Sequence, residues 1–287
     1  MLSCAVFFCG FFTAPKGGNK MKKKTLALCE AGIMIALSTV LAIMKLIDMP
    51  YGGSVTFGQM LPILIYAYRH GPAYGMGAAL TASVLQLLLG LENFSYLPLV
   101  NWYSIVVLAL LDYIVAYSAF GIAGLLKKKY DYRRSILLGG LIASVVRYLC
   151  HVISGFTAWA GFELPTGGVL LYSVGYNATY MIPETIVLLV AAYYLTSSID
   201  FSKDTPRRAS RIEANGNLAY LRVISGIAVF AAIIIDTALV FPHLQDGETG
   251  DFILSGLKNV DWISFAVVTA VCLGASAILH LVDKKKA

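Results

Sequence analysis

The sequence has few charged residues for its length. Only 13% of its 287 residues are Asp, Glu, Lys or Arg, whereas 58% are hydrophobic. Soluble domains usually contain about 25% charged and about 45–50% apolar residues. The composition therefore excludes a large soluble domain and indicates a membrane protein whose spans contact lipid.

Signatures of catalysis and of metal binding are also missing. The sequence has no Walker motif, no G-x-S-x-G elbow and no H-E-x-x-H helix. Its five cysteines show no metal or redox spacing, and they are Cys4, Cys9, Cys29, Cys150 and Cys272. We therefore expect no enzyme activity, no metal, no cofactor and no ATP hydrolysis by this chain.

The net charge of +6 does not indicate a nucleic-acid partner, because the cations form short clusters between apolar runs. Such clusters report the orientation of membrane spans. On one predicted side lie Lys22–Lys24, Arg69, Lys127–Lys129, Arg133, Arg134, Lys203, Arg207, Arg208, Arg211 and Lys284–Lys286. We expect a multi-pass protein of the cell membrane with both termini in the cytoplasm.

Eight apolar runs are candidates for membrane spans. They cover roughly residues 26–47, 57–69, 73–91, 100–126, 135–158, 169–197, 217–241 and 262–282. The second is short, and we expect it to continue from the preceding Gly-rich loop inside the protein. Only helices and closed barrels span lipid, and these runs have helical length, so the fold is predicted to be all-α.

The runs divide into a six-span unit at 25–197 and a two-span tail at 217–287. A polar, basic linker at 198–216 separates them. Residues 1–24 form an N-terminal leader whose first apolar run is too short to span and lacks a basic start. We expect Met21, followed by three lysines, to be the true start.

The stretch from His151 to Glu184 combines polar and aromatic residues with long apolar runs. Polar groups in hydrocarbon are costly and usually face a bundle interior or a watery cavity. His151 shares a helix face with Arg147, and Asn177 lies two turns before Glu184. Asp112 and Tyr113 lie within the fourth span.

Each of these residues also has a structural interpretation. Asp112 could simply neutralise Arg147, and His151 could make a hydrogen bond between helices. Trp159 and Tyr172 could belong to an interfacial aromatic belt, and Glu184 could pair with Arg147 or with backbone freed by Pro183. Together the residues favour a site for a small, flat, cationic ligand, because aromatic faces attract cations.

The first span carries a pair of small residues, Gly32 and Ala36, one helical turn apart. Small residues at this spacing let helices approach closely in membranes. The face could pack within the bundle or dock against another membrane subunit.

Several motifs resemble one known family. They are G-G-S-V-T at 52–56, R-H-G-P-x-x-G at 69–75, L-D-Y-x-x-A-Y at 111–117, R-Y-x-x-H-x-x-S-G at 147–155 followed by Trp159, and Y-S-x-x-Y-N at 172–177. Residues from about 25 to 197 thus resemble the thiamine-specific S component, the ThiT family, of energy-coupling-factor (ECF) transporters. The last two motifs are the most specific, and the tail lies outside the resemblance.

The resemblance implies a six-helix S-component bundle that binds thiamine near the outer face. It implies as partners a transmembrane coupling subunit and two cytoplasmic ATPases. The family's ligand contacts correspond to Asp112, where the family commonly has Glu, and to Tyr113, His151, Trp159, Tyr172 and Asn177. Tyr51 stands where a Trp of the family can close the site, and Gly32 and Ala36 correspond to the docking face.

Three alternatives remain open at this point. The chain could be an S component for another vitamin or a thiamine precursor. It could be a small intramembrane enzyme in which His151 and either Asp112 or Glu184 act as acid and base. It could also be a proton-coupled transporter that acts alone.

Overall fold

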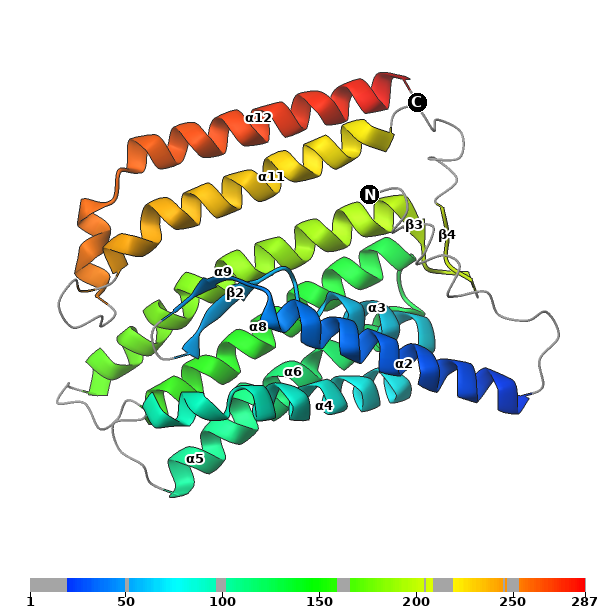
Figure 1. Cartoon of the computed structure of the whole chain (residues 1–287), viewed down its shortest axis with the longest axis horizontal. Helices are drawn as coiled ribbons and strands as arrows, with labels where there is room; N and C mark the ends of the chain where they lie inside the picture. The colour runs from blue at the N-terminus through cyan, green and yellow to red at the C-terminus, as the bar shows by residue number, and fades with distance from the viewer. Residues whose placement is uncertain are drawn as a thin grey trace.

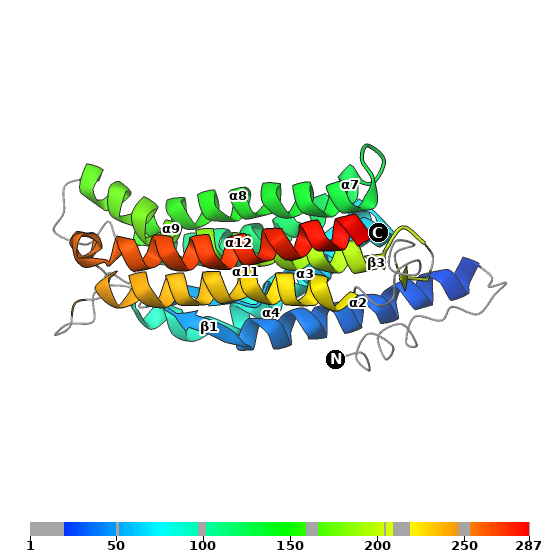
Figure 2. The same cartoon turned by 90° about the horizontal axis from the view of Figure 1, so that it is seen from above.

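The computed structural model describes residues 20–49, 52–96, 102–158, 166–203, 205–208, 219–244, 246 and 253–286. Long helices dominate these residues and run roughly parallel to one another (Figures 1 and 2). Seven helices in the described part are long and apolar enough to cross a membrane. The prediction of an all-α polytopic membrane protein is confirmed.

The N-terminal part of the bundle is built mainly from long helices. They are α2 (Lys20–Ile43), α4 (Pro72–Leu89), α8 (Tyr132–Ala158) and α9 (Thr166–Ser198), with the short α3 (Leu61–His70) between α2 and α4. The predicted span at 100–126 is an irregular helix in five pieces. These are α5 (Trp102–Leu108), the π-helix η3 (Ala109–Val115), α6 (Ala116–Ser118), the 3-10 helix η4 (Ala119–Ile122) and α7 (Ala123–Leu126).

The first span ends earlier than the sequence predicts. Helix α2 stops at Ile43, and the chain continues into a small antiparallel hairpin of β1 (Lys45–Asp48) and β2 (Ser54–Thr56). Gly52 lies between the strands at φ 95°, a conformation that other residues rarely adopt. Because the run of apolar residues continues past Ile43, hydropathy alone could not place this change from helix to strand.

Helix α3 occupies the place of the predicted second span. Its 10 residues rise only about 15 Å, against the roughly 30 Å hydrocarbon core of a bilayer. All but its last two residues are buried, and α2, α4, α7 and α8 pack around it. The expectation of a short segment inside the protein therefore holds. The start of α2 and the end of α12 lie toward the same end of the bundle (Figure 1).

A buried ion-pair cluster joins α2 to α3. The Glu30 carboxylate contacts Arg69 Nε at 2.5 Å and His70 Nε2 at 2.9 Å, and both Glu30 and Arg69 are almost fully buried. Burying a charge is costly unless it is paired, so these contacts fix the end of α3 against α2. Arg69 is thus paired with Glu30, in addition to being one of the cations that predict the orientation of the spans.

The C-terminal tail forms an outer layer on α9. It contains α11 (Ala219–Val240), η7 (Phe241–Leu244), η8 (Leu254–Asn259) and α12 (Trp262–Lys286). Helix α11 packs between α9 and α12, and α12 lies on the outside (Figure 1). Ser225 connects all three helices, because its Oγ lies 2.8 Å from both Tyr194 OH and Ser276 Oγ.

The predicted linker at 198–216 is described only in part. Its start forms a second small antiparallel ribbon of β3 (Ile199–Asp200) and β4 (Arg207–Arg208). Arg69 Nη1 donates to the carbonyl of Lys203 at 3.2 Å, so this ribbon packs near the end of α3.

Candidate functional site

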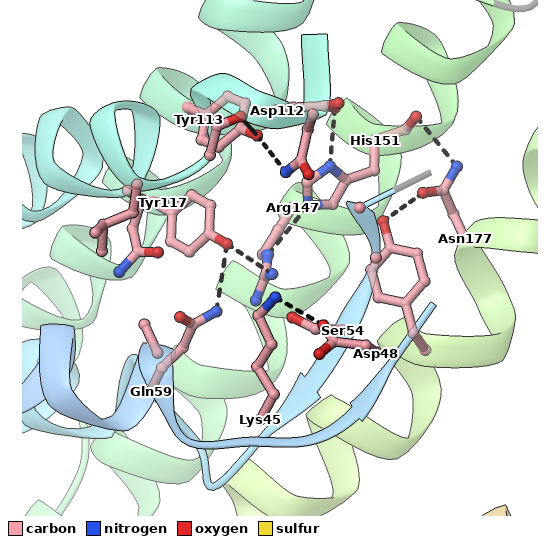
Figure 3. A pocket seen from close by; sticks show the side chains of 18 of the residues that line it. Lys45, Asp48, Ser54, Gln59, Asp112, Tyr113, Tyr117, Arg147, His151 and Asn177 are labelled. Carbon is pink, nitrogen blue, oxygen red and sulfur yellow. Dashed lines mark hydrogen bonds and ion pairs between the residues drawn. The ribbon is translucent and has the colours of Figure 1, made fainter. Parts of the chain in front are cut away.

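A cavity of about 460 Å³ lies between the β1–β2 hairpin and helices α4, η3, α8 and α9. This volume is within the range of about 300–1,000 Å³ that is typical of small-molecule sites. The lining includes charged, amide and aromatic side chains from all of these elements (Figure 3). The fold therefore brings polar residues of several predicted spans together at one pocket.

Asp112, His151 and Arg147 form a connected chain in the cavity wall (Figure 3). His151 Nδ1 lies 2.8 Å from Asp112 Oδ1, and Arg147 Nε donates to His151 Nε2 at 3.1 Å. An arginine Nε–H can only donate, so Nε2 accepts and the ring proton sits on Nδ1. His151 therefore donates to the Asp112 carboxylate.

The Asp112 position depends on the π-helix. Seven residues from Ala109 to Val115 form η3 inside the fourth span. A π-helix makes i→i+5 hydrogen bonds, widens the turn and is frequent at functional sites. Here it places Asp112 opposite His151 and turns the Tyr113 ring toward the cavity.

Arg147 is 4% exposed and has several partners besides His151. Its Nη2 donates to Tyr117 OH at 3.0 Å, and its guanidinium lies 4.5 Å from the centre of the same ring. Its Nη1 lies 3.9 Å from Glu184 Oε1. Of the two interpretations of Asp112, the direct pair with Arg147 is not formed, because His151 lies between the two side chains. Glu184 is the carboxylate beside Arg147.

Glu184 also anchors the hairpin. Its carboxylate accepts from Thr56 N at 2.5 Å and from Thr56 Oγ1 at 2.7 Å. Strand β2 is therefore tied to α9 next to the buried Arg147. The structural interpretation of Glu184 as a partner of Arg147 agrees with this geometry.

Asn177 lines the cavity, but both the nitrogen and the oxygen of its side-chain amide form hydrogen bonds within the protein. Nδ2 donates to the carbonyls of His151 at 3.2 Å and Ser173 at 2.9 Å, while Oδ1 accepts from Tyr180 OH at 2.6 Å. Asn177 thus joins α9 to α8 and holds the Tyr180 ring beside His151, whose ring centre is 6.1 Å away.

Tyrosines supply the aromatic surface of the cavity. Tyr113 is stacked between Phe94 and Tyr117, at centroid distances of 6.1 Å and 6.5 Å. Its hydroxyl accepts from Asn93 Nδ2 at 2.9 Å and donates to the Gly90 carbonyl at 3.1 Å. These bonds and the two stacked rings fix Tyr113 in the cavity wall.

The other predicted site residues lie elsewhere. Tyr172 is half-buried and stacks on Tyr176 at 6.4 Å, but it does not line the cavity. Trp159 and the possible gate Tyr51 lie outside the described residues. The structure therefore brings together Asp112, Tyr113, His151 and Asn177.

Sequence analysis did not identify several residues that line the cavity. They are Lys45, Asp48, Gln59, Glu92, Asn93, Tyr117, Tyr176 and Tyr180. Tyr117 and Tyr176 belong to the motifs quoted above, and that signal could have found them. Lys45 and Asp48, which pair at 2.7 Å, come from a hairpin that the apolar pattern did not reveal.

The charges on the lining residues do not cancel. Three carboxylates (Asp48, Glu92 and Asp112) face two cations (Lys45 and Arg147). Lys45 pairs with Asp48, and Glu184 lies beside Arg147, so in the described part of the chain the Asp112 carboxylate contacts the His151 ring and no cationic side chain. A cationic ligand would therefore find favourable charge at Asp112.

The small residues of α2 divide between two faces. Ala27 is buried, and its carbonyl accepts from Tyr66 OH at 3.1 Å. Gly32 and Ala36 are exposed, and a Cβ added at Gly32 would have nothing within 4 Å. The Gly32–Ala36 face is therefore not used for packing by the described part of the chain.

Comparison with known proteins identifies the family of the chain. The sequence pattern that defines the thiamine transporter protein family (Thia_YuaJ) matches residues 28–202. The chain belongs to this family. It is also similar to the thiamine transporter ThiT of Bacillus subtilis (strain 168), with 34% identity over 180 residues, which cover 58% of this chain and 88% of that protein.

Membership of this family has two consequences. The family is one of transporters, and with seven apolar helices it identifies a multi-pass membrane protein. The matched segment contains α3 to α9 and every residue that lines the cavity, whereas α11 and α12 lie beyond it.

Proposed function

We propose that the chain is the thiamine-binding membrane subunit of an ECF-type importer. The observation that carries the proposal is the cavity built around Asp112, His151 and Arg147 in a chain of the thiamine transporter family. In this proposal the protein takes up thiamine from outside the cell, and partner ATPases drive its transfer across the membrane.

The chemistry of the cavity suits thiamine. The aminopyrimidine ring has hydrogen-bond donors and acceptors, and the thiazolium ring has a permanent positive charge. The Asp112 carboxylate would accept from the amino group or stabilise the cation, and tyrosine faces would hold the flat rings. Asn177 and His151 would orient the pyrimidine, while Tyr113 and Trp159 would contribute aromatic contacts. Tyr172 would act through Tyr176, the cavity-lining ring on which it stacks.

The partner surface in this proposal is the exposed Gly32–Ala36 face of α2. A transmembrane coupling subunit would pack closely against these small residues. Two cytoplasmic ATPases would complete the assembly, since the chain has no nucleotide-binding motif of its own. Tyr51 would close the outer entrance.

The proposed unit that binds thiamine is the six-span domain at 25–197. The basic linker at 198–216 and the two-span tail at 217–287 would follow it, with residues 1–24 as a leader. The Lys and Arg clusters place both termini in the cytoplasm under the positive-inside rule, in a protein of the cell membrane.

The test uses the full chain purified with its co-expressed partners. Isothermal titration should show heat of binding with thiamine, and the bound molecule should be recovered chemically unchanged. The hydrogen-bonded Asp112–His151 pair would also suit an acid–base enzyme, so recovery of a modified product would replace the proposal with that alternative. Binding of another vitamin without binding of thiamine would contradict the assigned ligand.

The ECF assembly is tested separately. A coupling membrane subunit and ATPases should co-purify, and uptake into vesicles should require ATP. ATP-independent uptake driven by a proton gradient would instead support a transporter that acts alone.

A further inference from the structure

One apolar cluster, which we term the outer cluster, joins the hairpin, α9 and the tail. Its buried members are Met49, Val55, Val169, Tyr176, Tyr180, Met181, Val187 and Leu244. Met49 and Val55 come from the hairpin, and Leu244 comes from η7 in the tail. Three segments that are far apart in sequence thus share one core.

The hairpin has two functions in this arrangement. Gly52, Gly53 and Ser54 line the cavity, while Met49 and Val55 belong to the outer cluster. Gly53 N donates to Tyr176 OH at 3.2 Å, so the hairpin is held against a tyrosine that belongs to both the cavity lining and the cluster. The position of this cavity wall therefore depends on the cluster behind it.

Leu244 is the buried residue that the tail contributes to the outer cluster, with 2% of its surface exposed. Its carbonyl accepts from Ile253 N at 2.9 Å. Segment η8 packs closely on η7, because a Cβ on Gly256 would overlap the His243 carbonyl. Leu257 and Phe241 pack against the cluster around Leu244.

We propose that η7 and η8 of the tail hold the β1–β2 wall in place and so control how fast ligand enters and leaves the cavity. Moving the hairpin away from α9 would remove Met49 and Val55 from the outer cluster to which Leu244 also belongs. The tail would therefore act as a positioning element outside the region that matches the family. This inference rests on the proposed function, because thiamine is the ligand whose movement is measured.

The experiment compares Leu244→Ala with wild-type full-length protein in lipid nanodiscs, using radiolabelled thiamine. If the wall is less firmly held in both the empty and the loaded protein, association and dissociation should both accelerate. We expect each rate to rise about 10-fold, equivalent to ~1.4 kcal/mol. The equilibrium Kd should change less than about twofold, because the two rates rise together.

Leu281→Ala is the matched control. It removes the same atoms from α12, where the side chain is 58% exposed, and both rates should stay at the wild-type value. If Leu244→Ala does not fold, Leu244→Val makes a smaller change in the same place and should accelerate both rates to a smaller extent.

Two results would overturn the inference while leaving the proposed function intact. One is unchanged rates in a folded Leu244 variant. The other is faster release with unchanged association and a raised Kd, which would mean that the binding surface itself has loosened. Absence of thiamine binding in the wild-type protein would instead refute the proposed function, and this inference with it.

Discussion

Asp112 and Glu184 are both intramembrane carboxylates near Arg147, but their surroundings differ. Glu184 is buried beside Arg147 and accepts two hydrogen bonds from Thr56. Asp112 is more exposed, lines the cavity and contacts the His151 ring. These differences assign a structural role to Glu184 and leave Asp112 available to a ligand.

Substitution of Asp112 should therefore affect affinity more than stability. In Asp112→Asn the amide can still bond to His151, but the charge that attracts a cationic ligand is lost. A hydrogen bond to a charged group contributes about 1.5–3 kcal/mol, so thiamine affinity should fall roughly 10- to 100-fold. Isothermal titration and thermal unfolding of the same samples measure the two effects.

Arg147→Gln and the double variant complete the test. If Asp112 mainly neutralised Arg147, Asp112→Asn would lower stability, Arg147→Gln would restore it and affinity would hardly change. Asp131→Asn is a control at an exposed carboxylate, which lies 3.8 Å from Arg134 and outside the cavity lining. It should leave both quantities unchanged.

Glu184→Ala should give the opposite result, a large loss of stability. It would leave the Arg147 guanidinium buried without the carboxylate beside it and remove the acceptor for Thr56. Breaking a buried pair costs about 3–5 kcal/mol, so the free energy of unfolding should fall by about that amount. Glu92→Ala, at an exposed residue of the 3-10 helix η2 (Leu91–Tyr96), is the reference in thermal unfolding. Equal shifts for the two variants would remove Glu184 from this role.

Sequence reasoning found these residues because a charged or amide side chain within an apolar run is unusual. Asp112, His151 and Asn177 carried that signal, and the structure places all three at the cavity. Tyr117 and Tyr180 did not carry it, since tyrosines are ordinary in membrane helices. Their importance comes from the groups they contact across the bundle, which hydropathy does not report.

At the scale of elements, the main surprises are local departures from the regular helix. The sequence predicts one helix at 100–126, whereas the structure contains the π-helix η3 at Asp112. It also predicts a span through residue 47, whereas the chain forms β1 from Lys45. Both changes occur beside the cavity, where contacts between distant segments outweigh the local apolar pattern.

Helix α2 presents a testable surface at this scale. Gly32→Leu and Ala36→Leu should leave thiamine binding intact but abolish uptake, because a bulky side chain would hold a coupling subunit away. Neither residue lines the cavity, and Gly32 has open space around it. Binding to purified protein and uptake into cells are measured for each variant.

Gly77→Leu provides the matched control on α4. Gly77 is also an exposed helical glycine with nothing within 4 Å of an added Cβ. Its substitution should preserve both binding and uptake. Wild-type uptake in the double Gly32→Leu and Ala36→Leu variant would place the docking surface elsewhere.

At the scale of the whole molecule, the chain combines a segment that matches the family with a tail that lies beyond the match. Residues 28–202 contain the cavity, whereas α11 and α12 pack on its outer side through α9. The sequence predicted the order of these helices because long apolar runs are a strong signal, but it counted eight spans where the described part has seven helices long enough to cross a membrane. It did not predict that Leu244 would enter the core behind the cavity, since that contact joins segments almost 200 residues apart.

Removal of the tail should leave thiamine affinity nearly unchanged while removing the proposed control of the binding rates. A chain ending after Arg208 keeps the β3–β4 ribbon and every residue of the cavity lining. Thiamine should still bind it with a Kd within a few-fold of the wild-type value, because none of the proposed contacts is lost. Its thermal stability should fall, because the outer cluster would lose Leu244 and the tail residues packed against it. Titration with thiamine, after gel filtration has shown that the shortened protein is folded and monodisperse, measures the affinity. Loss of binding in that folded protein would mean that the tail completes the site rather than holding one of its walls.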